Sequence, residues 1–135
     1  MMSQQHVEKN VQKYLNENCI RLNPSEKKLQ DQINREIVST QNQCCTADCG
    51  QLMRVLIRGT NAARCLEIGC GMTTLSMAMA MQNEGKLVTI NNLERTVTPQ
   101  MKNIWKEAGV DTKVNFYVKN FTIHLKVDQL INLNK

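Results

Sequence analysis

The sequence predicts an α/β fold in which a helical lead-in is followed by a three-stranded parallel sheet with crossover helices. Two observations favour this fold. After residue 60, apolar segments of strand length alternate with segments of helical periodicity. In addition, residues 65–81, CLEIGCGMTTLSMAMAM, read as a buried strand, a glycine turn and a helix. The order strand, helix, strand, helix, strand indicates parallel strands joined by right-handed crossovers.

The composition is that of one domain of 135 residues, with 41% hydrophobic and 21% charged residues. No apolar run of about 18 residues occurs, so no membrane partner is expected. The first residues lack the apolar centre of a secretory signal, which predicts a cytoplasmic protein whose six cysteines are thiols. The net charge is +5, but the basic residues are scattered and aromatic residues make up only 4%, so no nucleic-acid partner is expected.

Residues 1–43 form a polar, helix-prone segment that we expect to be separate from a second unit, residues 44–135. Two apolar stripes with spacings of three and four predict two helices in the first segment. Asn23-Pro24-Ser25 separates the helices, with Ser25 as the expected cap of the second. The stripes contain Val7, Val11, Tyr14 and Leu15, and then Leu29, Ile33 and Ile37.

A third helix is expected to start at Thr46 or Asp48, either of which can cap it. It should end at Gly59, because glycine suits a left-handed cap. The first strand then covers residues 64–68, the turn 69–71, and the next helix 72–82. Apolar positions along the third helix are Leu52, Val55 and Leu56, and the face of the helix 72–82 contains Leu75, Ala78, Met79 and Gln82.

Residues 85–91 predict the second strand and residues 113–118 the third, with a helix that opens at Pro99 between them. Residues 121–127 alternate between apolar and polar side chains, which favours a strand, although a helix remains an alternative. The inward positions of the helix after Pro99 are Met101, Ile104, Trp105 and Ala108.

The glycine turn is the candidate ligand site, because open α/β sheets bind ligands beyond the carboxyl ends of their strands. Gly69 and Gly71 can adopt positive φ and let a ligand approach the backbone, and the following helix presents N–H groups at its amino end. The turn reads G-C-G-M-T-T, without the third glycine of a dinucleotide site. Glu67 can hold a cofactor amine, or it can simply bond to the turn itself.

Residues 43–118 resemble the front half of an S-adenosylmethionine-dependent O-methyltransferase of the caffeoyl-CoA and catechol O-methyltransferase type. The family has a G-Q-x-L helix, a strand ending in L-E-I-G, a helix of the LAMAL type, GKV at the second strand, and W-x-x-A-G-V before the third strand. The matching features here are Gly50-Gln51, residues 66–69, residues 76–81, residues 85–88, and Trp105 with residues 108–110.

The resemblance implies a partial Rossmann-like methyltransferase fold that binds S-adenosylmethionine. The region of Cys44, Cys45 and Thr46 would meet the methionine end of the cofactor. Asn91 stands where the family has an acid that accepts both ribose hydroxyls. The implied cofactor-binding residues are Cys45, Glu67, Gly69, Gly71, Thr74, Ser76 and Asn91.

The function implied by the resemblance is methyl transfer from S-adenosylmethionine to a hydroxyl of a small molecule. The family also uses a divalent cation, whose ligands follow a fourth strand and are expected to be absent here, together with the base. The alternative is a catalytically inactive, truncated methyltransferase-like domain that acts as a binding or interaction module. Because the fourth strand of the family lies beside the first and is expected to be absent here, the outer edge of the first strand would be covered by the tail or by a second copy in a homodimer.

A zinc site built from cysteines is the remaining alternative. Cys44, Cys45 and Cys49 do not have the spacing of paired zinc ligands, and His6 and His124 are solitary. The sequence therefore predicts no metal site.

Overall fold

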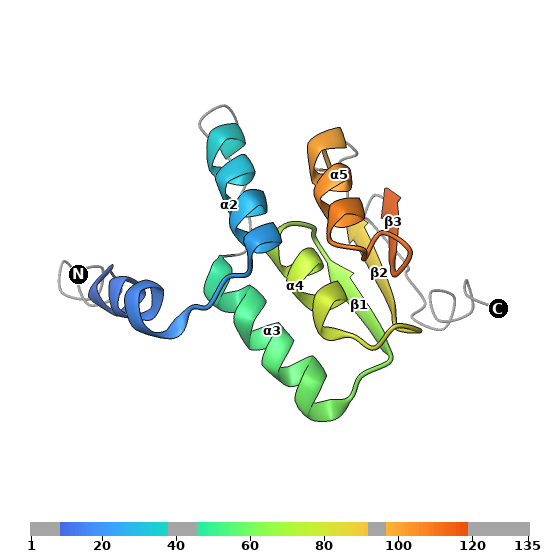
Figure 1. Cartoon of the computed structure of the whole chain (residues 1–135), viewed down its shortest axis with the longest axis horizontal. Helices are drawn as coiled ribbons and strands as arrows, with labels where there is room; N and C mark the ends of the chain where they lie inside the picture. The colour runs from blue at the N-terminus through green and yellow to red at the C-terminus, as the bar shows by residue number, and fades with distance from the viewer. Residues whose placement is uncertain (1–8, 38–45, 92–96, 119–135) are drawn as a thin grey trace, which may run out of the picture.

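The computed structural model describes residues 9–37, 46–91 and 97–118, and in this part it forms a parallel sheet with helices packed on it (Figure 1). The strands are β1 (Arg64–Ile68), β2 (Lys86–Asn91) and β3 (Val114–Val118), in the order β1-β2-β3. In the register of the sheet, Glu67 lies beside Thr89. The predicted α/β fold is confirmed.

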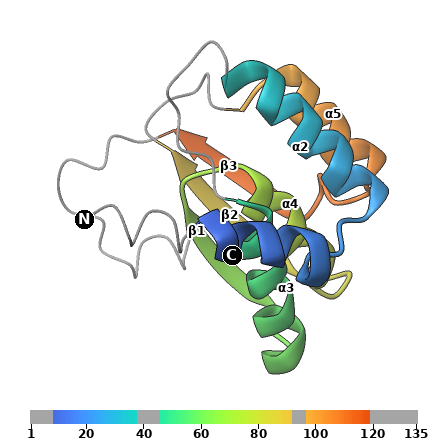
Figure 2. The same cartoon turned by 90° about the vertical axis from the view of Figure 1, so that its left-hand side faces the viewer.

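Helices α2 (Pro24–Ile37), α3 (Ala47–Thr60), α4 (Met72–Ala80) and α5 (Pro99–Glu107) gather on one side of the sheet (Figures 1 and 2). In both views α2 and α5 lie next to each other, and Lys28 of α2 forms an exposed ion pair with Glu107 of α5. The core between helices and sheet includes Leu29, Ile33, Ile57, Leu75, Leu87, Met101, Ile104 and Trp105.

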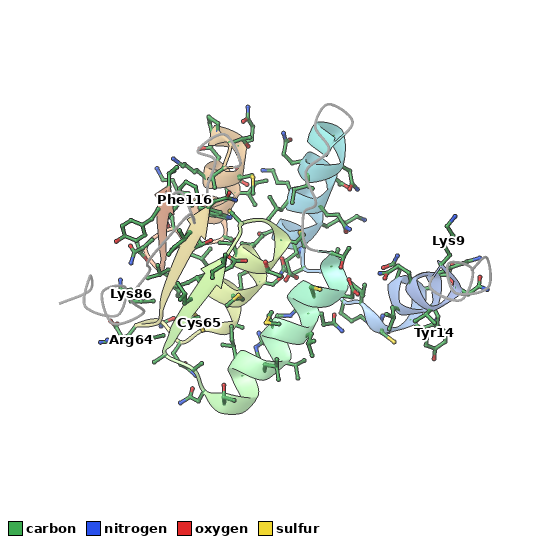
Figure 3. The ribbon with its side chains drawn as sticks, turned by 180° about the vertical axis from the view of Figure 1, so that it is seen from behind. Lys9, Tyr14, Arg64, Cys65, Lys86 and Phe116 are labelled. Atoms are coloured by element: carbon green, nitrogen blue, oxygen red, sulfur yellow. The ribbon has the colours of Figure 1, made fainter. Side chains whose placement is uncertain are left out.

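The first helical segment, residues 9–19, extends away from the sheet (Figures 1 and 3). Residues 9–14 are α-helical and continue into the π-helix η1 (Leu15–Cys19). Val11 and Tyr14 of the predicted stripe are 51% and 61% exposed, so this stripe is not buried against the described residues. Val7 lies outside the described residues.

Helix α2 begins two residues earlier than a cap at Ser25 would give, and Asn23 caps it. The Asn23 side-chain Oδ1 accepts from the backbone N–H of Glu26 at 2.9 Å, and Glu26 Oε2 accepts from the N–H of Asn23 at 3.0 Å. This reciprocal pair is a capping box, with Pro24 at the first helical position where its missing N–H is tolerated. The prediction of Ser25 as cap was therefore wrong.

Helix α3 passes through Gly59 and ends at Thr60, which corrects the predicted end. Asn61 adopts the left-handed conformation, with φ +51, and its N–H bonds to Arg58 O. Asparagine tolerates this conformation better than most residues, which explains why glycine is not needed. The apolar positions Leu52, Val55 and Leu56 lie on the exposed side of the helix.

Helix α4 is buried along most of its length, from Met72 to Ala78. It ends at Ala80, two residues before the predicted end, so Gln82 lies beyond the helix and is exposed instead of sharing a face with Leu75. The Lys113 ammonium donates to Met81 O at 3.0 Å just beyond the helix end. Such a cation satisfies carbonyl groups that a helix end leaves without intrahelical donors.

Helix α5 agrees closely with the prediction. Thr98 caps it by accepting from the N–H of Met101 at 3.3 Å. Met101, Ile104 and Trp105 are buried, and Ala108, just after the helix, is half-buried. Trp105 thus anchors the helix on the sheet side, as expected.

Figure 3 shows the molecule from behind. In this view Arg64 and Lys86 lie together at the amino ends of β1 and β2. Leu66 and Ile68 are 43% and 70% exposed, and within the described residues β1 pairs with β2 alone. A homodimer through this edge stays a prediction, and residues 121–127 lie outside the described part.

Among the described helices, none has the length and apolarity needed to cross a membrane.

Candidate functional site

The loop between β1 and α4 is fixed to the carboxyl end of β2 by two hydrogen bonds. The backbone N–H of Gly69 donates to Ile90 O at 2.8 Å, and Thr89 Oγ1 donates to Gly69 O at 2.6 Å. Asn91 follows as the last residue of β2 and is half-buried. The candidate site thus lies where a parallel sheet binds ligands.

Gly69 is the residue of this loop that requires glycine. Its φ of +109 is rarely adopted by L-residues with a side chain, and no heavy atom outside residues 68–70 lies within 4 Å of the place where a Cβ would stand. The backbone is therefore open to close approach at this point. Gly71 has a φ of 163, which is extended backbone and not the left-handed region, so it does not use the conformational freedom expected of it.

The carboxylate of Glu67 is bonded to hydroxyls at the amino end of α4. Thr73 Oγ1 donates to one carboxylate oxygen, and Thr74 Oγ1 donates to the other at 2.6 Å. Thr74 Oγ1 also accepts from the N–H of Gly71 at 3.1 Å. These contacts join the end of β1, the turn and the start of α4 into one unit.

Burial raises the pKa of the Glu67 carboxyl above its ordinary value of 4.5, and the hydrogen bonds from Thr73, Thr74 and Thr89 counteract this shift. Burial acts in this direction because a charged carboxylate loses hydration in a low-dielectric environment. The carboxylate of Glu67 is thus bonded to the first turn of α4, directly after the glycine turn. Its contact with a cofactor stays a prediction.

The other predicted cofactor residues lie in different surroundings. Thr74 is fully buried at the turn. Ser76 is also buried, but its hydroxyl donates to Glu26 of α2 at 2.6 Å, on the side of α4 that faces α2 and α3. Thr46 is exposed at the start of α3, and Cys45 lies outside the described residues. The structure thus brings Glu67, Gly69, Gly71, Thr74 and Asn91 to the carboxyl edge of β1 and β2. Ser76 lies instead on the side of α4 that faces α2 and α3.

Sequence reasoning did not identify Thr73 and Thr89, although both shape the site. The register of a parallel pair places Thr89 beside Glu67, so aligning the two predicted strands would have found it. Thr73 is harder to predict from the sequence, because Thr73 and its neighbour Thr74 can both reach the carboxylate of Glu67.

No cluster suited to a metal ion occurs among the residues that the structure describes. Cys19, Cys49, Cys65 and Cys70 form no disulfide bond among the described residues.

Gly69→Ala should destabilise the fold by about 1–3 kcal/mol, because a side chain disfavours this φ. Gly59→Ala is the matched control, since its Cβ also meets nothing within 4 Å but Gly59 lies inside α3. That substitution should stabilise by about 0.5–1 kcal/mol. Urea unfolding of both variants measures the two effects. Equal shifts of the same sign would show that the conformation of Gly69 is not special.

Glu67→Gln should remove a pH-dependent part of the stability. The raised pKa means that the folded state binds the proton more tightly, so this contribution is complete below the unfolded pKa near 4.5 and is lost as pH rises through the higher folded value. Urea unfolding of wild type and variant between about pH 4 and 7 gives the difference. Glu107→Gln, at an exposed ion pair, is the control. Parallel profiles for wild type and Glu67→Gln would contradict the role of burial.

Comparison with known proteins agrees with this geometry. A family model described as O-methyltransferase matches residues 17–135, so the match begins inside the predicted lead-in. A probable caffeoyl-CoA O-methyltransferase 3 of Dictyostelium discoideum is 31% identical over 78 residues, which are 56% of this chain and 31% of that protein.

Two solved structures show the same arrangement of elements. The O-methyltransferase TomG from Streptomyces achromogenes, solved with SAM, has a TM-score of 0.69 and 28% identity, over 93% of this chain and 54% of that one. An O-methyltransferase from Bacillus cereus, solved with SAH, has a TM-score of 0.68 and 18% identity, over 93% and 56%. The chain thus spans about half the length of these solved proteins and under a third of the curated relative. On the family match, the chain belongs to the O-methyltransferase family.

Proposed function

We propose that this chain binds S-adenosylmethionine at the carboxyl edge of β1 and β2, as part of an enzyme that methylates a hydroxyl of a small molecule. The observation that carries the proposal is the open backbone at Gly69 beside the held carboxylate of Glu67. The solved relative TomG contains SAM, and its sequence is 28% identical to this chain.

The residues of this edge fit the cofactor in chemical type. Gly69 lets a ligand approach the main chain without meeting a side chain. Glu67 keeps the loop at the amino end of α4, where helix geometry directs backbone N–H groups outward. Asn91 would offer its amide to the ribose hydroxyls. When bound, the cofactor supplies an electrophilic methyl group, and this chain would contribute its orientation.

A methyltransferase-like module that binds without transferring a methyl group is the second candidate function. Asn91 favours it, because a neutral amide makes weaker hydrogen bonds to hydroxyls than the carboxylate that the family places there. The two candidates share the same site and differ in affinity and turnover.

Isothermal titration with S-adenosylmethionine should give heat of binding at micromolar to high micromolar cofactor. Glu67→Ala should weaken the affinity about tenfold, since it releases the turn from α4. Glu107→Ala is the control, because Glu107 ends α5 at the opposite edge of the sheet. The absence of heat from the folded wild type would remove both candidate functions. Transfer from labelled cofactor to a catechol then separates enzyme from binding module.

Asn91→Asp should tighten cofactor binding about fivefold, because hydrogen bonds to a charged group are stronger by about 1 kcal/mol. The titration is compared with Asn61→Asp, which introduces the same charge between α3 and β1, away from the site. Unchanged affinity in Asn91→Asp would mean that the end of β2 does not face the ribose.

A further inference from the structure

The polar groups on the side of α4 that faces α2 and α3 form a second anchor, centred on Glu26. Glu26 is fully buried, at 0% exposure, and belongs to the first turn of α2. One carboxylate oxygen accepts from Ser76 Oγ at 2.6 Å, and the other from Arg54 Nη1 of α3 at 2.8 Å. A buried carboxylate is tolerated when it is paired and hydrogen-bonded in this way.

The chain before α2 is tied into the same cluster. Gln51 of α3 donates to Cys19 O at 2.6 Å and accepts from the N–H of Arg21 at 2.7 Å. Arg54 uses its second nitrogen to donate to Arg21 O at 2.8 Å. Residues 19–26 are thus attached to α3 and, through Glu26, to α4.

Close contact between α3 and α4 depends on Gly50. A Cβ at this position would lie 2.7 Å from Ser76 Oγ, which is too close for real atoms. The serine hydroxyl therefore occupies the space that glycine leaves and points toward Glu26. This fit leaves little freedom for the hydroxyl.

Helix α4 is consequently held by carboxylates on two sides. Thr74 bonds to Glu67 of β1, and Ser76, two residues later and about 200° around the helix, bonds to Glu26. Seven consecutive residues from Met72 to Ala78 are buried, so apolar packing does little to distinguish one rotation of this helix from another. The acid–hydroxyl contacts on the two sides of the helix do distinguish them.

We propose that Glu26 is a positioning residue that, through Ser76, fixes the rotation of α4 and so the geometry of the turn at residues 69–71. The proposal rests on the function proposed above for that turn. Residues 19–26 then contribute indirectly to cofactor binding, because a displacement of Glu26 would shift α4 and with it the turn at residues 69–71.

The test uses the full chain with Glu26→Gln and with the double variant Glu26→Leu/Arg54→Met. The double variant replaces the buried pair by apolar groups, which is often neutral or stabilising, and removes the anchor without leaving an unpaired charge. Lys28→Ala is the control, because it breaks the exposed contact of α2 with α5 and leaves Glu26 in place. Circular dichroism establishes that each variant is folded at the temperature used.

Two readouts are expected to change in both Glu26 variants and not in the control. Without ligand, amide hydrogen exchange at residues 69–74 should be several times faster. With S-adenosylhomocysteine as probe, the Kd should rise about fivefold or more. A folded double variant with wild-type exchange and wild-type Kd would overturn the positioning role. If the wild type takes up no probe but exchange still accelerates in the double variant, the positioning role holds and the proposed function fails.

Discussion

The contact between Glu67 and the threonines of α4 determines the geometry on which the candidate site depends. A carboxylate that has lost much of its hydration needs hydrogen bonds in place of water, and Thr73 and Thr74 supply them. Because Thr74 also accepts from the N–H of Gly71, one hydroxyl links strand, loop and helix. The loop can therefore be short and still hold an open backbone at Gly69, since its two ends are fixed independently of any ligand.

The same logic extends from the turn to the whole of α4. A helix buried on nearly all sides gains much from the hydrophobic effect, but that gain is not directional. The rotation of the helix about its axis is fixed instead by polar contacts, because their hydrogen bonds are lost when the helix rotates. On the sheet side this role belongs to Glu67 and on the opposite side to Glu26. The site is thus built from elements that are far apart in the sequence but are coupled by a single helix.

The sequence predicts the local features of this fold better than the contacts between its elements. Strand alternation and helical spacing are properties of neighbouring residues, so the three strands and α5 with buried Trp105 could be anticipated. Helix caps were less certain, because Asn23 and Ser25 are both good caps and the position of Pro24 decides between them.

The turn at Gly69 could be predicted, since strand, glycine and helix follow one another along the chain. The anchor of Glu26 could not, because its partner Ser76 lies 50 residues away and the pairing depends on how three helices pack. From the sequence, a glutamate at the third position of a helix is expected to be an ordinary capping residue. Glu26 does make that capping contact, with the N–H of Asn23. Its other carboxylate oxygen accepts from Ser76, and this contact cannot be predicted from residues close to Glu26 in the sequence.

The amide at Asn91 has a further consequence for the electrostatics of this edge. Thr89 lies beside Glu67 in the sheet, and Asn91, two residues on, points to the same face by the alternation of a strand. An acid at this position would place a second negative charge near a carboxyl whose pKa burial already raises, and like charges disfavour each other's ionisation. A neutral Asn91 avoids that repulsion. Under the proposed function, the same amide would give weaker hydrogen bonds to the ribose hydroxyls than a carboxylate. The two effects of Asn91 would then oppose each other.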